Sequence, residues 1–116
     1  MIKPKMLAAI IDATRVLLRH RSMALLAFNN YTIVDDDCDS DGGLGGPDAS
    51  ILLIAKPGHE AFALSEDISN QCESALGAAF NAFYPNCSVI VRTCSTEDVN
   101  EWNKCRAAAG KPLIGT

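Results

Sequence analysis

The run Ile51–Ala55 constrains the fold more than any other stretch, because its five consecutive apolar residues leave no polar face. It belongs to the segment 49–55, which reads Ala-Ser-Ile-Leu-Leu-Ile-Ala and predicts a strand. A strand without alternation is typically buried on both faces. Tyr31–Val34, which contains aromatic and β-branched residues, predicts a second strand. We therefore expect the core to form around these two strands.

An acidic, glycine-rich loop at residues 35–48 separates the two strands. It carries six aspartates and no basic residue: Asp35, Asp36, Asp37, Asp39, Asp41 and Asp48. The net charge of the chain is −4, so without these six carboxylates the remainder would carry +2. The acidity is therefore local. A nucleic-acid partner is not expected, because nucleic-acid binders cluster basic side chains on one face.

Helical periodicity predicts three helices, at residues 5–21, 66–83 and 97–109. Apolar side chains recur in each at spacings of three and four residues, which places them on one face. Serine or threonine stands just before the second and third segments, as is typical of helix starts. Gly110 and Pro112 follow the third segment and favour a helix end there.

Other segments complete the predicted fold. Met23–Phe28 favours a strand that turns at Asn29–Asn30 into Tyr31–Val34, and continuation of the first helix is the alternative. Residues 59–64 fit a short strand or an irregular segment, and Cys87–Cys94 fits a further strand. Together the elements predict an α+β fold, with a single mostly antiparallel sheet of four or five strands and three helices packed on it.

The composition predicts a small cytoplasmic globular protein. No linker or repeat divides residues 1–116, so we expect a single α+β domain. The longest apolar runs are too short to cross a bilayer, so no membrane partner is expected. The N-terminus lacks a signal-peptide pattern, and five cysteines without a Cys-x-x-Cys pair predict free thiols. On the last predicted helix, Val99, Trp102 and Cys105 share the face expected in the core.

The acidic loop contains a metal-loop pattern. Asp37-Cys38-Asp39-Ser40-Asp41-Gly42 is a D-x-D-x-D-G string, and Asp48 is twelfth when Asp37 is counted first. Residues 37–48 thereby resemble the calcium-binding loop of the EF-hand family, in which alternating carboxylates supply hard oxygen ligands and the glycine permits a sharp turn. The resemblance implies a calcium site with these ligands: Asp37, Asp39, Asp41, the Gly43 carbonyl and Asp48. It covers the loop alone, since Asp48 replaces the family's Glu and the flanking segments do not predict helices. A solvated hairpin loop is the alternative.

Three functions stay open. We favour a small, soluble, non-catalytic interaction protein that acts by docking to a partner, because no catalytic constellation can be assembled from the pattern. The only histidines are His20 and His59, and no Gly-x-x-x-x-Gly-Lys loop occurs. An enzyme is therefore not favoured, and no catalytic or cofactor-binding residue is assigned. The first alternative is a calcium-binding module that uses Asp37–Asp48. The second is a small metal-dependent hydrolase that uses the carboxylates of Asp35–Asp41.

The helix at residues 5–21 predicts a homodimer. Its apolar side chains cover about 220° of the helix circumference, whereas a helix that lies on one sheet needs a stripe of about 100°. The surplus strip, which holds Leu7, Ile11 and Leu18, must be covered. A second copy of the chain would cover it by two-fold pairing. Another helix of the same chain is the alternative.

Overall fold

A three-stranded mixed sheet forms the centre of the computed structural model, which describes residues 4–35, 48–85, 87–110 and 113–114. The strands are β1 (Tyr31–Asp35), β2 (Asp48–Ala55) and β3 (Ser88–Cys94), and β2 lies between the other two. β2 runs antiparallel to β1 and parallel to β3. The prediction of a mostly antiparallel sheet with four or five strands is therefore wrong, whereas the α+β class is confirmed.

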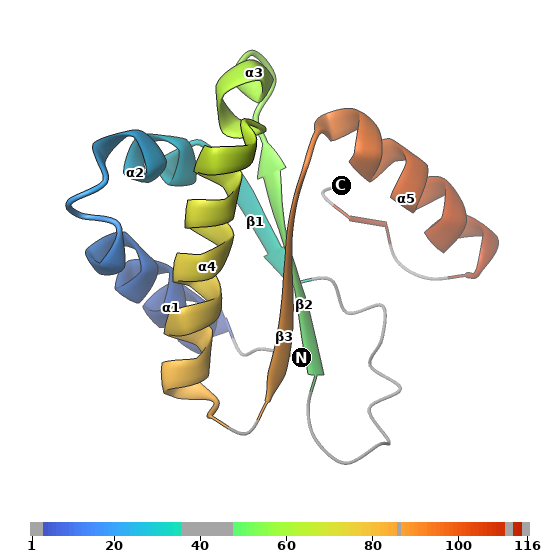
Figure 1. Cartoon of the computed structure of the whole chain (residues 1–116). Coiled ribbons are helices and arrows are strands. Elements are labelled where there is room, and N and C mark those ends of the chain that lie inside the picture. Colours follow the sequence, from blue (N-terminus) through green and yellow to red (C-terminus); the bar gives the residue numbers. More distant parts are fainter. Residues whose placement is uncertain (1–3, 36–47, 86, 111–112, 115–116) are drawn as a thin grey trace.

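Within the described residues the chain forms five helices, not the three that were expected (Figure 1). They are α1 (Pro4–Leu17), α2 (Ser22–Asn29), α3 (Glu60–Ala63), α4 (Glu66–Phe83) and α5 (Thr96–Ala108). The second predicted helix matches α4 at both ends. No helix of the described chain has the length and apolar character needed to cross a membrane.

The two extra helices occupy a segment for which a strand was favoured, Met23–Phe28, and a segment that fitted either a short strand or an irregular stretch, residues 59–64. Met23–Phe28 lies in α2, where Ala24, Ala27 and Phe28 are buried at the three- and four-residue spacing of a helix face. The Asn30 N–H donates to the Ala27 carbonyl at 2.9 Å, so the two asparagines end a helix and do not turn a hairpin. Residues 59–64 contain the single helical turn α3.

The parallel pairing follows from the connection between β2 and β3. The chain leaves β2, passes through α3 and the 18-residue α4, and enters β3 in the same direction as β2. A helix of this length returns the chain to the end of the sheet at which the first strand began, as parallel pairing requires. The sequence predicted a helix at 66–83 between the strands at 49–55 and 87–94. This order favours parallel pairing of the two strands, whereas the predicted sheet was mostly antiparallel.

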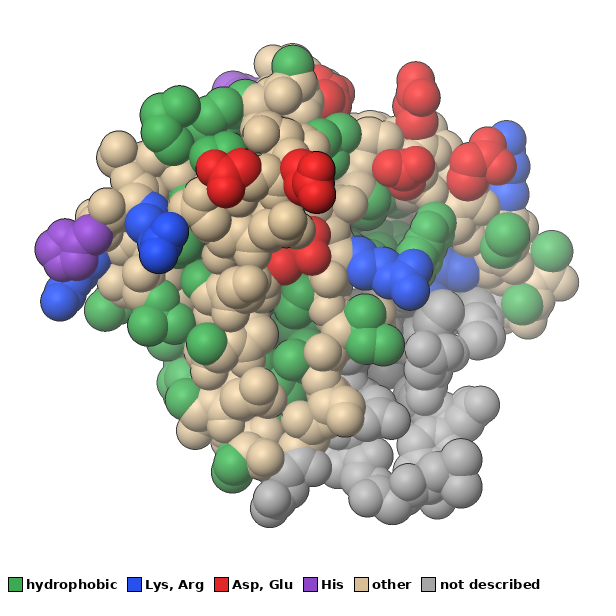
Figure 2. Space-filling view, viewed as in Figure 1, with side chains coloured by type: hydrophobic (Ala, Val, Ile, Leu, Met, Phe, Trp, Pro, Cys, Tyr) green, Lys and Arg blue, Asp and Glu red, His purple; other side chains and the backbone are tan. Residues whose placement is uncertain are grey.

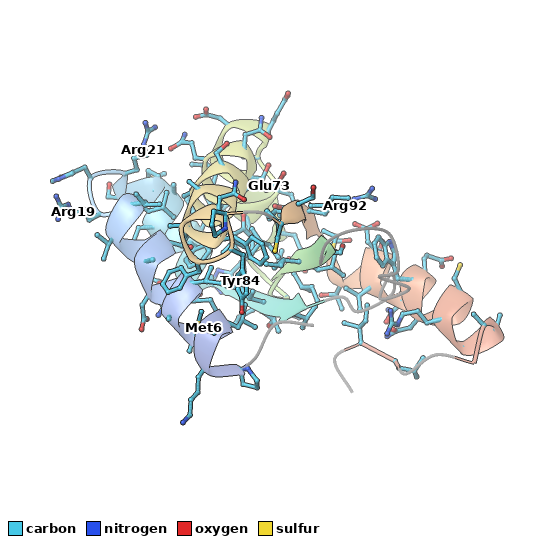
Figure 3. All side chains as sticks on the ribbon, turned by 90° about the horizontal axis from the view of Figure 1, so that it is seen from below. Met6, Arg19, Arg21, Glu73, Tyr84 and Arg92 are labelled. Carbon is cyan, nitrogen blue, oxygen red and sulfur yellow. The ribbon has the colours of Figure 1, made fainter. Side chains whose placement is uncertain are left out.

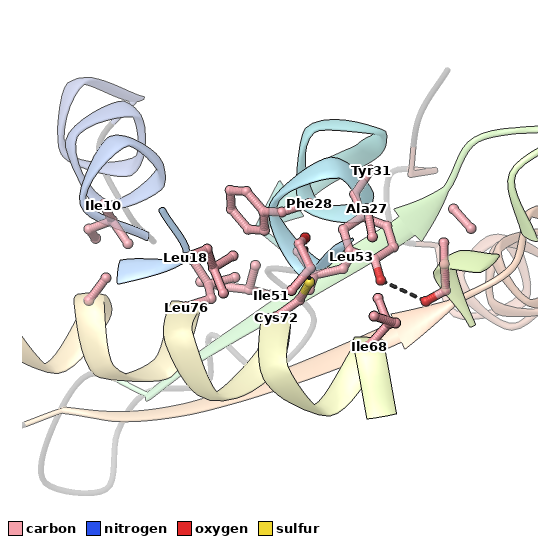
Figure 4. Packing of buried hydrophobic residues seen from close by; sticks show 14 of the residues in the cluster. Ile10, Leu18, Ala27, Phe28, Tyr31, Ile51, Leu53, Ile68, Cys72 and Leu76 are labelled. Carbon is pink, nitrogen blue, oxygen red and sulfur yellow. Dashed lines mark hydrogen bonds between the residues drawn. The ribbon is translucent and has the colours of Figure 1, made fainter. Parts of the chain in front are cut away.

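The central strand is buried on both faces, as the apolar run predicted. Every residue of Ile51–Ala55 is buried. Ile51 and Leu53 face the larger core cluster beneath α1, α2 and α4, whereas Leu52 and Ile54 face a smaller cluster beneath α5 (Figures 1 and 4). The helices thus cover the sheet from both sides.

The strip on the first helix that was expected to need a partner is covered by the chain itself. Leu18 is only 1% exposed, and Leu7 and Ile11 pack against the larger cluster. α4 lies alongside α1, and Leu76 of α4 lies close to Leu18 in the core (Figure 4). This arrangement is the alternative in which another helix of the same chain provides the cover. This strip therefore needs no second copy of the chain to cover it, and dimerisation stays a prediction.

The predicted inner face of α5 is only partly correct. Val99 is buried and Trp102 is half-buried, but Cys105 is exposed. In this part of α5 the buried side chain is that of Arg106, which is only 9% exposed, and not that of Cys105 beside it. Trp102 contributes to the smaller cluster without being enclosed by it. The Arg92 guanidinium lies 5.9 Å from the centre of its ring.

Candidate functional site

The acidic loop contributes no described metal site. Asp37, Asp39, Asp41 and Gly43 lie outside the residues that the structure describes. Asp48 is the first residue of β2, in register with Ser88 of β3. In the described part of the chain, no three His, Cys, Asp or Glu side chains are grouped so that they could hold a metal ion. The calcium site and the hydrolase site therefore stay predictions.

A cluster of exposed apolar side chains marks another surface. Four residues, which we call the α1–α2 corner, are each more than half exposed: Val16 (58%), Leu17 (52%), Met23 (57%) and Leu26 (56%). They are four of the seven most exposed large hydrophobic side chains among the described residues, and they lie within eleven consecutive positions. Figure 2 shows hydrophobic side chains over both helices at this corner, with basic side chains between them. Exposed apolar side chains that gather in this way mark contact surfaces more often than single ones do.

The composition of α2 explains why the corner is apolar. Six consecutive residues of this eight-residue helix, Met23–Phe28, are hydrophobic, so the helix has no polar face. Ala24, Ala27 and Phe28 pack into the core, and Met23 and Leu26 consequently point outward. A helix that is hydrophobic all round is normally covered on every side. The sequence pattern could have revealed this surface, had the segment been assigned as a helix.

Two hollows open beside the corner, where α4 runs past it. The first has a volume of about 440 Å³ and lies between Leu17 and the small side chains Ser74, Ala75 and Ala78 of α4. The second has a volume of about 470 Å³ and is lined by residues 20–24 and by α4. Small residues on α4 leave room that larger side chains would fill.

Arg21 separates the two hollows and lines both of them. One of its terminal nitrogens donates to Oε1 of Gln71 across the gap, at 3.3 Å. Asp67 of α4 lines both hollows as well, so a cation from one helix and an anion from another share their walls. Arg19 and Arg21 project from the turn that follows α1 (Figure 3). The surface thus combines an apolar centre with charges of both signs.

Arg15 links α1 to α2. Its Nε donates to Oδ1 of Asn29 at 2.9 Å, and a terminal nitrogen forms an ion pair with Asp12 at 3.0 Å. One side chain therefore bridges the two helices that present the apolar residues. Because the ion pair is exposed, it contributes little to the free energy of unfolding.

A buried polar cluster beneath α4 is structural. The Tyr31 hydroxyl donates to the Ala63 carbonyl at 2.7 Å, and the Cys72 thiol donates to the Ala24 carbonyl at 3.3 Å (Figure 4). Burial raises the pKa of the Cys72 thiol to about 11, and burial also raises the pKa of Tyr31 above its ordinary value. A reactive cysteine needs a thiolate near neutral pH, and burial of Cys72 disfavours the thiolate.

Comparison with known protein families, curated proteins and solved structures finds no match to the chain.

Proposed function

We propose that the protein is a non-catalytic interaction protein that docks to a protein partner through the α1–α2 corner. The observation that carries this proposal is the exposure of Val16, Leu17, Met23 and Leu26, each above one half. Covering apolar surface favours a complex, because it removes that surface from water. The adjoining hollows add concave surface into which side chains of a partner would fit.

The partner that we propose is a second copy of the chain. The first helix was predicted to pair with its own copy through Leu7, Ile11 and Leu18. Those residues are covered, so we propose that the exposed Val16 and Leu17 of this segment form the contact instead. Basic residues at the end of α1 and Asp67 on α4 lie on the same face. A two-fold axis would bring the basic part of one copy against the acidic part of the other, because such an interface is self-complementary.

Sedimentation velocity at micromolar concentration tests this proposal. We expect a dimer that dissociates when Leu17→Glu and Met23→Glu are combined, because both side chains are exposed and the fold should tolerate them. Ile90→Glu is the matched control, since Ile90 of β3 is also 52% exposed but lies away from the corner. Leu18→Glu is unsuitable, because a charge at a buried position would unfold the protein. A wild-type monomer, or a dimer lost only in Ile90→Glu, would contradict the proposal.

The acidic loop keeps its calcium prediction as an alternative function. If Asp37–Asp48 binds calcium, the melting temperature should rise with calcium concentration, since a ligand of the native state stabilises it. Asp41→Ala should abolish that rise, whereas Asp12→Ala, on the exposed side of α1, should not. No rise at millimolar calcium would remove this alternative. A phosphatase screen with magnesium or manganese tests the hydrolase that would use Asp35–Asp41.

A further inference from the structure

We infer that a groove between the sheet and α5, independent of the α1–α2 corner, binds a small organic anion with an apolar body. This edge groove has a volume of about 310 Å³. The carboxyl end of β2, the start of β1, α5 and the segment after α5 line it. The lining residues are Thr32, residues 54–57, Thr96, Val99, Asn100, Asn103 and Ile114. It lies where the carboxyl end of β2 meets the start of the helix that follows β3. Open α/β sheets bind their ligands at this end of the parallel strands.

The floor of the edge groove is apolar and partly uncovered. Ile54, Val99 and Ile114 are each 8% exposed, whereas Leu52 in the same core cluster is 1% exposed. The three residues that keep exposed area are those that line the groove. A floor of this kind favours an apolar ligand body, because covering it removes hydrophobic surface from water.

The rim of the edge groove supplies one cation and several neutral polar groups. Among the described residues that line it, Lys56 has the only charged side chain and none has a carboxylate. Thr32 and Asn100 add a hydroxyl and an amide group around the same opening, whereas the Thr96 hydroxyl already donates to the Ala55 carbonyl at 3.4 Å. A single lysine beside neutral donors suits a carboxylate or another singly charged group.

Asp98 and Glu60, which are close in sequence to lining residues, each accept hydrogen bonds from groups outside the edge groove. Asp98 accepts from the N–H and the hydroxyl of Ser95, at 2.9 and 3.0 Å, as part of the cap of α5. Glu60 accepts from the Gly58 N–H at 2.8 Å. Neither side chain lines the edge groove. Lys56 therefore brings a positive charge to the edge groove, and none of the described residues that line it is an anion.

The outer wall of the edge groove is formed before any ligand binds. The Asn103 side chain donates to the Ile114 carbonyl at 3.0 Å and accepts from the Ile114 N–H at 2.8 Å. This paired contact holds Ile114 against α5 in the way that a neighbouring strand would. A site that is already in shape loses less conformational freedom when it binds.

Nitrogen-15 NMR titration with 4-phenylbutyrate tests the inference, and 4-phenylbutanol serves as the uncharged probe of the same shape. We expect amide shifts at Lys56, Thr96 and Asn100 with both probes. Lys56→Gln should weaken phenylbutyrate binding about tenfold, because it removes a charge-assisted hydrogen bond, and should leave phenylbutanol binding unchanged. Lys5→Gln is the matched control, since Lys5 is an exposed lysine of α1.

Three outcomes would overturn the inference. The first is the absence of shifts at the groove residues at millimolar phenylbutyrate. The second is an equal loss of phenylbutyrate binding in Lys56→Gln and Lys5→Gln, which would mean that only the overall charge matters. The third is an equal loss of both probes in Lys56→Gln, which would indicate a changed structure and not a lost ion contact. The amide spectrum of each variant reports whether the fold is retained.

Discussion

At the scale of single residues, Tyr31 joins the sheet to the helices. It is 5% exposed, and its hydroxyl satisfies the carbonyl at the end of α3 (Figure 4). Tyr31→Phe should lower the free energy of unfolding by about 1–2 kcal/mol, because the Ala63 carbonyl would stay buried without a donor. Urea denaturation measures this loss. Tyr84→Phe is the control and should be nearly neutral, since Tyr84 contributes a ring stacked on Phe80. Equal losses in the two variants would show that the hydroxyl of Tyr31 has no special value.

The described thiols should differ in their reactivity. Cys105 is exposed, whereas Cys72 is buried and burial raises the pKa of both Cys72 and Cys94 to about 11. Only the thiolate reacts with iodoacetamide, so Cys105 should be modified first at pH 8, followed by Cys94 and Cys72 after much longer exposure. Mass spectrometry of digested protein gives the order. In guanidinium chloride the difference should vanish, and labelling of Cys72 in the folded protein at the rate of Cys105 would disprove its burial.

The same thiols make stability depend on alkaline pH. An unfolded thiol loses its proton near its ordinary pKa of 9.0, whereas the Cys72 thiol keeps its proton in the folded protein until pH approaches 11. The folded state therefore binds more protons in this window, and the free energy of unfolding should fall as pH rises from about 9 to about 11. Cys72 contributes a slope of up to about 1.4 kcal/mol per pH unit, and its stabilising effect is fully present below pH 9.

Denaturation at a series of pH values checks this slope. Cys72→Ala should make it shallower, whereas Cys105→Ala, which removes an exposed thiol, should leave it unchanged. An identical slope in wild type and Cys72→Ala would mean that the buried thiol does not set the pH dependence.

At the scale of elements, two serines in equivalent positions should behave differently. Ser95 accepts from the Asp98 N–H, and the Asp98 carboxylate accepts from the Ser95 N–H, which completes a capping box at the start of α5. Ser65 occupies the corresponding position before α4, but its side chain makes no capping bond. Ser95→Ala should therefore cost about 1 kcal/mol, and Ser65→Ala should cost much less. Thermal denaturation of both variants decides, and a larger loss in Ser65→Ala would contradict the assignment.

Local pattern predicted some elements well because their own residues decide their structure. α4 has polar and apolar faces along its whole length, and its ends agree with the prediction. α2 was mistaken for a strand because a short apolar run carries no period, and packing against α4 decides its conformation. Cys105 was placed in the core because it shares a helical face with Val99, but the residue buried in this part of α5 is Arg106. The parallel direction of β3 depends on the path of the chain, which no local pattern contains.

At the scale of the whole molecule, the candidate sites were harder to predict than the core. Sequence reasoning chose the acidic loop, because charge patterns stand out in a composition. The α1–α2 corner and the edge groove are made of common residue types such as Leu17, Met23 and Lys56. These residues mark a surface only because the fold leaves them exposed or places them along a hollow. Exposure depends on every neighbouring element at once, so it cannot be read from one segment. The burial of Ile51–Ala55, by contrast, follows from five residues alone.

The central position of β2 also determines how the amide protons of the sheet exchange with solvent. β2 pairs on both sides, whereas β1 and β3 each pair on one side within the described chain. Amides that can open only when the whole domain unfolds exchange most slowly. The protons of Ile51–Ile54, which have partners in both β1 and β3, should therefore be the last to be replaced by deuterium, after those of β1 and β3. Hydrogen exchange followed by NMR would show this order, and faster exchange in β2 than in β3 would contradict it. The slowest of these protons would then measure the free energy of unfolding in water, without any denaturant.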